Sequence, residues 1–395
     1  MKTRVLFVFE YPPEDEAMAR SLIAGLRARR PDLEFASVHG WFREYRPGGL
    51  RPHRLGNILW VYLQTAWQVR FGRVDAVIVR SAPPGIQLWT QWWARVRRVP
   101  VICWLMDYHP EIEARLLDRR GPEFLAAWLR KIDATLMPGF ALVVVLDQAM
   151  ADLARRRTGG GNVEQHPTWG DARPGGLTPV SYVPGQGGRP LNLAYSGNLG
   201  VAHSLAPLAE LLRAVRQRHE VNLFVIGTSP AGEGLFRRLG VDLGVSVTIH
   251  ARVPFASLPG LYEQWCIDAG IVLLKEESAG LVSPSKFSGY IDFGLPIVYF
   301  GPAGTSSAEV CVRFRGGFWI PSQPDPAALP AAVMGLLDAG AMVAAATGAR
   351  AAARHFAACN GDTLAEIMSP RIPAAAGRAA GSVSPLVLQT GEATR

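Results

Sequence analysis

The sequence lacks several features that would assign a protein class directly. Its four cysteines lie far apart with no Cys-x-x-Cys pair, so neither a zinc site nor a disulfide framework is indicated. No apolar run approaches the ~18 residues of a membrane-spanning helix. The first apolar run, at residues 5–9, is too short for the core of a signal peptide. We therefore expect a cytoplasmic protein, with peripheral attachment to the inner face of the cell membrane left open.

Lysine is also scarce, and the basic residues are unevenly placed. Only four of the 41 basic side chains are lysines. Residues 1–190 hold 26 basic and 18 acidic residues and so carry the whole net charge of +8, whereas residues 191–395 hold 15 of each. This excess indicates an anionic partner for the first half: nucleic acid, a membrane surface or a phosphorylated substrate. The alternative is that the many arginines reflect the base composition of the genome rather than a partner.

The chain is 49% hydrophobic, and its short apolar runs alternate with helical patterns. Apolar runs bounded by turns indicate strands, and apolar residues three and four positions apart indicate helices. We expect strands near residues 5–9, 35–38, 76–79, 101–105, 142–146, 191–195, 221–226, 247–249, 269–274 and 297–300. We expect helices near residues 16–30, 58–69, 85–96, 124–136, 205–217, 258–264 and 286–293, then one long helical stretch from 326 to about 368.

This alternation predicts an α/β protein whose parallel sheets are covered on both faces. Residues 171–190 are dense in Gly and Pro and form the best candidate for a linker. We therefore expect two doubly wound, Rossmann-like domains that face a central cleft, the first over residues 1–180 and the second over 188–368. Residues 371–395 are expected to form a disordered tail.

A first candidate phosphate site follows the expected strand at 191–195. The segment Tyr195-Ser-Gly-Asn-Leu-Gly200 is followed by His203 and then by a helical pattern. A glycine turn that opens onto a helix binds anions through backbone N–H groups and the helix dipole. His203 would add a further donor. An ordinary tight turn is the alternative interpretation.

A second candidate anion site lies further along the chain. Ser283 suits a helix N-cap and Pro284 the first helical position, which places Lys286 in the first turn. A lysine is unfavourable at the positive end of a helix dipole, so Lys286 indicates a nearby anion such as a diphosphate. The alternative is a surface lysine paired with Glu276 or Glu277.

These motifs resemble those of a known family. Residues 280–302, GLVSPSKFSGYIDFGLPIVYFGP, resemble the nucleotide-sugar signature of family 4 glycosyltransferases of GT-B fold, in the bacterial polysaccharide branch. Residues 193–200, LAYSGNLG, resemble the glycine loop that opens the family's second domain, and Asp107-Tyr-His-Pro-Glu111 resembles a turn of its first domain. The likeness spans about residues 4–365.

The resemblance implies a hexosyltransferase that moves a sugar from a UDP- or GDP-linked donor to a glycan or polyprenyl-diphosphate-linked acceptor. It implies retention of configuration, a role in exopolysaccharide or cell-surface glycan biosynthesis, an acceptor-binding first domain and a donor-binding second domain. The implied catalytic residues are Asp107, His109 and Lys286. The implied donor-binding residues are Gly197, Asn198, Gly200, His203, Glu277, Ser283, Pro284, Ser285 and Lys286.

The sequence departs from the family at four donor-site positions. The common Arg and Lys that neutralise the diphosphate are Asn198 and His203 here. Many members carry a Glu, seven residues and a second Glu, and these positions are Leu281 and Gly289 here. A nucleotide-sugar 2-epimerase shares the fold but needs a carboxylate-rich donor site. A basic nucleic-acid-binding protein is disfavoured because the phosphate-type turns lie in the neutral half. No Asp-x-Asp motif occurs, so we expect neither a metal ion nor a cofactor besides the donor.

The basic excess of the first half coincides with aromatic residues between positions 41 and 98. Residues 41–73 interleave Trp41, Phe42, Tyr45, Trp60, Tyr62 and Trp67 with Arg43, Arg46, Arg51, Arg54, Arg70 and Arg73. Trp89 and Trp93 follow, before Arg95, Arg97 and Arg98. Such surfaces suit an anionic membrane interface. The alternative is that the tryptophans pack in the core and the arginines are solvated.

Overall fold

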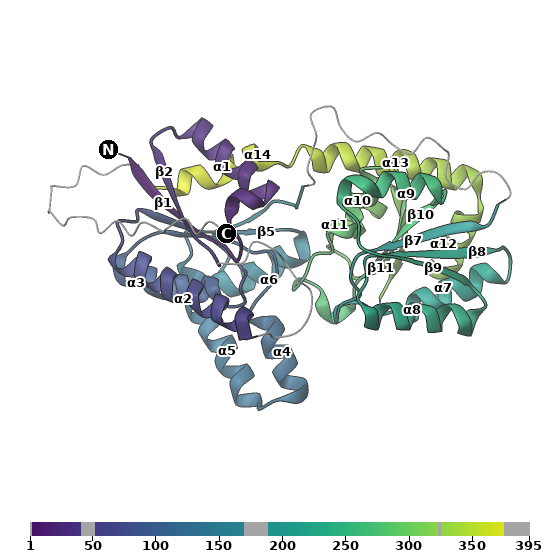
Figure 1. The fold of residues 1–395 in the computed structure, drawn as a ribbon, viewed down its shortest axis with the longest axis horizontal. Coiled ribbons are helices and arrows are strands. Elements are labelled where there is room, and N and C mark those ends of the chain that lie inside the picture. The colour runs from purple at the N-terminus through teal and green to yellow at the C-terminus, as the bar shows by residue number, and fades with distance from the viewer. Residues whose placement is uncertain (1, 41–51, 170–188, 323–324, 375–395) are drawn as a thin grey trace, which may run out of the picture.

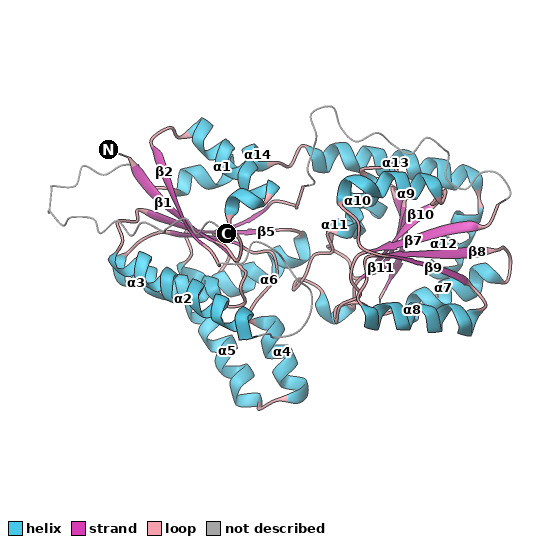
Figure 2. Ribbon diagram, in the orientation of Figure 1, coloured by secondary structure: helices cyan, strands magenta, loops and turns pink. Residues whose placement is uncertain are grey.

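The computed structural model describes residues 2–40, 52–169, 189–322 and 325–374. In these residues the chain forms two parallel six-stranded sheets, each flanked by helices on both faces, in two lobes side by side (Figure 1). Figure 2 shows the alternation of strand and helix in both lobes. The expected α/β class and the two Rossmann-like domains are confirmed. The expected linker, residues 171–190, falls almost entirely outside the described residues, as do residues 375–395 of the expected tail.

The first sheet has the strand order β2-β1-β3-β4-β5-β6. Its central strands are apolar on both faces and nearly inaccessible to solvent, which is the signature of a sheet covered on both sides. The strands are β1 (Thr3–Val8), β2 (Leu33–Val38), β3 (Ala76–Arg80), β4 (Val101–Trp104), β5 (Leu142–Val145) and β6 (Val163–Gln165). The helices are α1 (Ala17–Arg29), α2 (Pro52–Phe71), α3 (Ile86–Arg97), α4 (Glu111–Arg120), α5 (Glu123–Leu136) and α6 (Gln148–Thr158).

The second sheet has the order β12-β11-β10-β7-β8-β9. Its strands are β7 (Leu191–Ser196), β8 (Val221–Ile226), β9 (Ser246–His250), β10 (Ala269–Leu273), β11 (Ile297–Gly301) and β12 (Gly317–Pro321). Its helices are α7 (Ala206–Arg216), α8 (Pro230–Leu243), α9 (Leu258–Gln264), α10 (Lys286–Ile291), α11 (Ser306–Val312), α12 (Ala328–Leu337) and α13 (Ala339–Ala357). The carboxyl ends of β7 and β10 lie at the point where the strand order reverses, which is where such sheets open a ligand crevice.

The long helical stretch expected from residue 326 is three helices in the structure. Asp338 ends α12 and caps α13, because its side chain accepts the N–H of Ala341 at 2.6 Å. Asn360 caps α14 (Gly361–Met368) and forms a capping box with Thr363. The sequence expectation missed these breaks, and it also missed the short strands β6 and β12.

The last helix returns to the first domain. The expected boundary counts α14 with the second domain, whereas α14 packs against α1 (Figure 1). Arg29 of α1 pairs with Asp362 and Glu366, each at 3.1 Å. His166, at the end of the first domain, is 2.9 Å from the Thr363 hydroxyl through Nε2. These contacts tie the carboxyl end of the described chain to its amino end.

No single helix in the described residues is long and apolar enough to cross a membrane. Taken together, α12 and α13 have the length and apolar composition of a membrane span, but the two helices are bent by 98° relative to each other.

We expect Gly361→Ala to destabilise the contact between α14 and α1. An added Cβ would lie 2.1 Å from the Ser21 carbonyl carbon, a backbone atom that cannot move alone. The free energy of unfolding should fall by about 1–3 kcal/mol in urea denaturation. Gly234→Ala in α8 is the control: its Cβ would meet nothing within 4 Å, so stability should rise by about 0.5–1 kcal/mol. Equal free energies of unfolding for Gly361→Ala and the wild type would contradict the close contact between α14 and α1.

Candidate functional site

The loop after β7 sits at the reversal of strand order and is fixed by its own backbone. Gly197 has a φ of 104°, a conformation that favours glycine, and its N–H donates to the Ile226 carbonyl at 2.7 Å. The Leu199 N–H donates to the Thr228 hydroxyl at 3.3 Å. The Asn198 side-chain oxygen accepts the Ser229 N–H at 3.2 Å. The first expected phosphate site is thus a rigid loop held by the turn after β8.

Lys286 crosses over this loop. Its ammonium donates to the Tyr195 hydroxyl and, at 2.8 Å, to the Asn198 carbonyl oxygen, and it lies 4.1 Å from the centre of the Tyr195 ring. A Cβ on Gly197 would come within 3.0 Å of the Lys286 side chain. The two expected anion sites are therefore one site, because the glycine makes room for the lysine.

The Lys286 ammonium is largely buried and has no counter-charge among the described residues. Burial lowers the pKa of Lys286 to about 7. Neither Lys286 nor Lys275 forms an ion pair with any described residue, so the alternative pairing with Glu276 or Glu277 does not occur. A buried cation without a carboxylate partner is costly unless an anion completes the site.

His203 lies beside this lysine and is neutral. Its Nδ1 accepts the Gly200 N–H at 2.9 Å, so in the neutral ring the proton is on Nε2. Burial, reinforced by the positive charge of Lys286, lowers the pKa of His203 to about 4. His203 therefore offers an uncharged N–H donor. The Gly197 and Gly200 N–H groups, which we expected to face an anion, are already bonded within the protein.

A cavity of about 330 Å³ opens next to this loop at the carboxyl ends of β10, β11 and β12. Ser204 and Lys275 contribute to its lining, with Glu276 and Glu277 beside them. The Lys275 N–H donates to the Ala202 carbonyl at 2.9 Å, which joins the loop after β10 to the loop after β7. Two of the chain's four lysines thus converge on the reversal point of the second sheet.

The helix that carries Lys286 begins later than expected. We expected Ser283 as its N-cap and Pro284 as its first residue, but Ser285 is the N-cap and Lys286 is the first helical residue. Ser283 instead follows Val282, which forms a bridge with Asp107 of the first domain, and Pro284 is buried. Packing between the domains outweighs the local capping preference of Ser283. Lys286 still lies at the start of the helix.

Glu277 lies at the contact between the domains rather than in the lysine cluster. Its carboxylate accepts a hydrogen bond from Arg119 of α4 at 2.9 Å, and its carbonyl oxygen accepts one from Arg115. The Arg119 guanidinium lowers the pKa of Glu277. Glu277 thus bridges the domains and also lines the cavity beside Lys275, where its expected role in donor binding stays a prediction.

Asp107 and His109 follow β4 and face the second domain. Asp107 forms an isolated antiparallel bridge with Val282, and the next residue, Tyr108, donates its N–H to the Leu281 carbonyl at 2.7 Å. Burial raises the pKa of Asp107. His109 Nδ1 is 2.6 Å from a Glu113 carboxylate oxygen. The expected catalytic pair is therefore joined to the lysine cluster through the segment that leads into α10.

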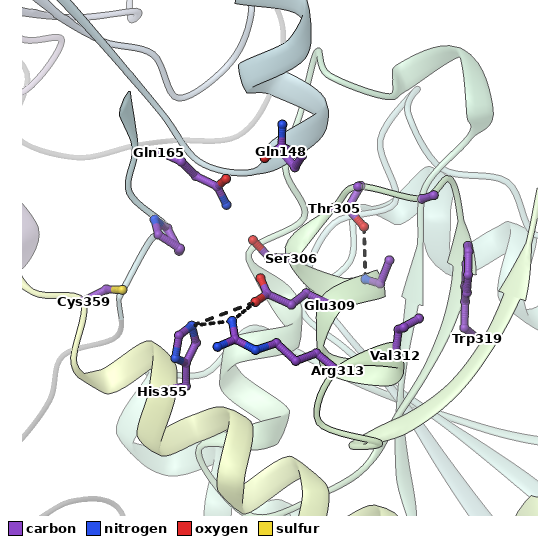
Figure 3. Close-up of a pocket in the computed structure, with 14 residues that line it drawn as sticks. Gln148, Gln165, Thr305, Ser306, Glu309, Val312, Arg313, Trp319, His355 and Cys359 are labelled. Carbon is purple, nitrogen blue, oxygen red and sulfur yellow. Dashed lines mark hydrogen bonds and ion pairs between the residues drawn. The ribbon is translucent and has the colours of Figure 1, made fainter. Parts of the chain in front are cut away.

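A larger cavity of about 740 Å³ separates the domains on another side (Figure 3). Gln148 and Gln165 line it from the first domain. Across from them, Arg313 pairs with Glu309 at 2.6 Å, and His355 Nε2 is 4.0 Å from the same carboxylate. No residue predicted as donor-binding or catalytic lines this cavity.

Two tyrosines that shape the site were not predicted. The Tyr290 hydroxyl accepts the Ser196 N–H at 2.7 Å and donates to the Ala194 carbonyl at 3.0 Å, which joins α10 to the end of β7. A Cβ on Gly270 would lie 2.2 Å from the Tyr290 ring, so that glycine admits the ring. Both tyrosines lie within the two motifs described above, but we gave neither of them a role. Their contacts could not be predicted, because their partners are far away in sequence.

The described residues contain no group of three or more His, Cys, Asp or Glu side chains placed to hold a metal ion.

Comparison with known proteins shows the fold. No family model and no curated protein matches the sequence. Among solved structures, Anabaena Alr3699/HepE in complex with UDP is similar with a TM-score of 0.59 and 13% identity, over 94% of this chain and 99% of that chain. WaaG, a glycosyltransferase involved in lipopolysaccharide biosynthesis, is similar with a TM-score of 0.61 and 14% identity, over 93% and 99%. The structural neighbours are GT-B glycosyltransferases, and this chain has the GT-B fold.

We expect Lys286→Met to stabilise the ligand-free protein below about pH 7. The folded-state pKa of Lys286 is near 7, below its ordinary value of 10.5, so below pH 7 folding buries a charge. This cost falls as pH rises from 7 to 10.5, because the unfolded state then binds more protons. Urea unfolding at pH 6.5 and pH 10 should show a gain that shrinks with pH. Lys131→Met, at an exposed lysine, should show no such trend; a gain independent of pH would contradict the assignment.

Proposed function

We propose that this protein is a glycosyltransferase that takes a sugar from a nucleotide-sugar donor. The observation that carries the proposal is the buried, unpaired ammonium of Lys286 over the loop after β7. This loop lies where an open parallel sheet binds its ligand. The neighbouring folds support the proposal, because HepE was crystallised with UDP and with UDP-glucose.

The proposed mechanism stabilises the leaving nucleoside diphosphate. Cleavage of the bond between sugar and phosphate leaves negative charge on the phosphate oxygens while the sugar gains oxocarbenium character. Lys286 would exchange its neutral acceptors, Tyr195 and Asn198, for a phosphate oxygen, which gives a charge-assisted hydrogen bond. His203 Nε2 would donate a second hydrogen bond. Side chains would thus perform the role that we expected from the glycine-loop amides.

Lys275 would add charge at the adjacent cavity. It approaches His203 closely enough for its charge to lower the pKa of that ring. The 330 Å³ cavity between Lys275 and Ser204 would hold the part of the donor beyond the phosphates. In this proposal the two lysines stabilise the phosphate charge, so no metal ion is needed. The reaction would be a hexosyl transfer that uses a UDP- or GDP-linked donor and no further cofactor.

The acceptor would approach from the first domain. Asp107 and His109 lie at the carboxyl end of β4; Asp107 contacts the segment leading to Lys286, and His109 contacts Glu113 of α4. Burial raises the pKa of Asp107, and its carboxyl group would hydrogen-bond and orient an acceptor hydroxyl without taking its proton. We propose that the acceptor is a glycan or a polyprenyl-diphosphate-linked glycan. The transfer would retain the configuration of the sugar, with the leaving phosphate accepting the proton of the acceptor hydroxyl. The protein would act in cell-surface polysaccharide biosynthesis on the cytoplasmic side of the membrane.

A panel of UDP- and GDP-sugars, followed by thermal shift and by hydrolysis of the donor, tests the donor site. One nucleotide should raise the melting temperature of the wild type. Lys286→Met should weaken its binding about 10- to 100-fold, because a hydrogen bond to a charged group is worth about 1.5–3 kcal/mol. Lys131→Met should bind as the wild type does. Absence of stabilisation by every nucleotide, or equal binding by Lys286→Met, would sink the proposal.

Nucleotide binding should also take up a proton above neutral pH. At pH 8 the ligand-free Lys286 is mostly neutral, since its pKa is about 7, and a bound diphosphate would restore its charge. Calorimetric titration with UDP or GDP in phosphate and in Tris buffer at pH 8 should show uptake of close to one proton per nucleotide. Lys286→Met should show almost none. Uptake that is the same in both proteins would assign the proton to another group.

A further inference from the structure

One surface of the first domain carries an unusual density of exposed apolar side chains. Along α2, every fourth residue is apolar and more than half exposed, forming a stripe of Leu55, Leu59, Leu63, Trp67 and Phe71. The opposite side of α2 packs on the core through Val61 and Val69. A helix that packs on one side needs no large apolar residues on the other. The stripe therefore indicates a second environment.

The neighbouring helices extend this stripe. α2 packs against α3 and α3 against α5, and Figure 1 shows α2, α3 and the α4–α5 hairpin on one side of the first sheet. Trp92 and Val96 of α3 are each about 60% exposed, as is Trp128 of α5 at 56%. We call these residues, with the α2 stripe and Phe124, the apolar face.

The positions of the tryptophans in α3 correct part of the membrane interface that we expected from the sequence. Trp89 and Trp93, which we expected at a membrane interface, pack against the core of the first domain. Trp92 between them is the exposed residue. Residues 41–51, where the expected interface began, lie outside the described part of the chain.

The apolar face includes a groove with cations along its rim. The groove has a volume of about 630 Å³ and lies between α3 and α5. Trp92, Val96 and Trp128 are among the residues that line it. Arg95 and Lys131, both exposed, stand at its edge. Apolar floor and basic rim match an anionic lipid, whose acyl chain and phosphate need these two environments.

The charge pattern distinguishes a bilayer from a protein partner. The sequences of α2 and α3, residues 52–71 and 86–97, contain no acidic residue, and α5 adds Glu123 beside Phe124 at its start. The rim of a protein interface is polar, whereas an anionic bilayer attracts basic residues beside apolar ones. Trp and Arg are also the side chains suited to the boundary between head groups and acyl chains.

We propose that the apolar face docks on an anionic lipid bilayer. The apolar stripe of α2 would lie in the head-group region with its axis near the membrane plane, and the groove between α3 and α5 would receive a lipid. The positive net charge of the first half of the chain would thus serve to attract the protein to an anionic membrane. This inference goes beyond the proposed glycosyl transfer, and its test needs neither donor nor acceptor.

Vesicle flotation tests the proposal. The wild type should bind vesicles of phosphatidylglycerol and phosphatidylcholine more tightly than vesicles of phosphatidylcholine alone. Trp92→Gln with Trp128→Gln should weaken binding at least about tenfold, through lost apolar burial. Arg95→Gln with Lys131→Gln should weaken binding to anionic vesicles about fivefold for each charge removed and leave binding to neutral vesicles unchanged.

The control removes two exposed apolar residues from the second domain. Leu235→Gln with Val241→Gln, on α8, changes residues as exposed as those of the apolar face and should bind like the wild type. Thermal melts should match for all variants, because every substituted side chain is exposed. Failure of the wild type to bind vesicles, or equal binding by the tryptophan variant, would overturn the proposal. So would a wild-type dimer, seen by light scattering, that only the tryptophan variant disrupts.

Discussion

Parallel pairing of strands buried on both faces is the constraint on which the rest of the structure depends. A parallel strand needs a crossover before the next one, and here helices provide the crossovers and cover the sheet. Every strand of a sheet therefore ends at the same edge. Where the crossovers change sides, between β7 and β10, the edge opens. The glycine loop and Lys275 lie there because the chain has to turn there, and Lys286 enters from the following helix.

The buried ammonium of Lys286 gives this edge its chemical character. In the ligand-free protein its neighbours are neutral acceptors: a tyrosine hydroxyl and a backbone carbonyl. These satisfy its hydrogen bonds without neutralising its charge, so the site retains its affinity for an anion. His203 remains neutral beside it because burial disfavours the charged ring and the positive charge of Lys286 adds to this effect. In the proposed function, the diphosphate of the donor would complete this cluster.

The uneven charge of the chain is divided between two different tasks. The second half is neutral in total, yet it holds the proposed diphosphate site, because two local lysines act at short range. The first half spreads its surplus over helix surfaces, where many weak contacts with a charged surface add together. Contacts between Glu277 and Arg119, and between Tyr108 and Leu281, connect the two halves. In the two proposals, the geometry of one site would bind the donor, and the net charge of one face would bind the membrane.

The sequence by itself determined the α/β class, the two domains, most of the strands and the position of the glycine loop. Strands buried on both faces, glycines with positive φ and scarce lysines all leave local signals. Tertiary structure alone decided that Tyr195 would meet Lys286, 91 residues away, and that Glu277 would pair with Arg119, 158 residues away. It also placed α14 on α1 and moved the first residue of α10 from Pro284 to Lys286. Such contacts depend on which surfaces meet after folding, and the residues that make them carry no local mark of their partners.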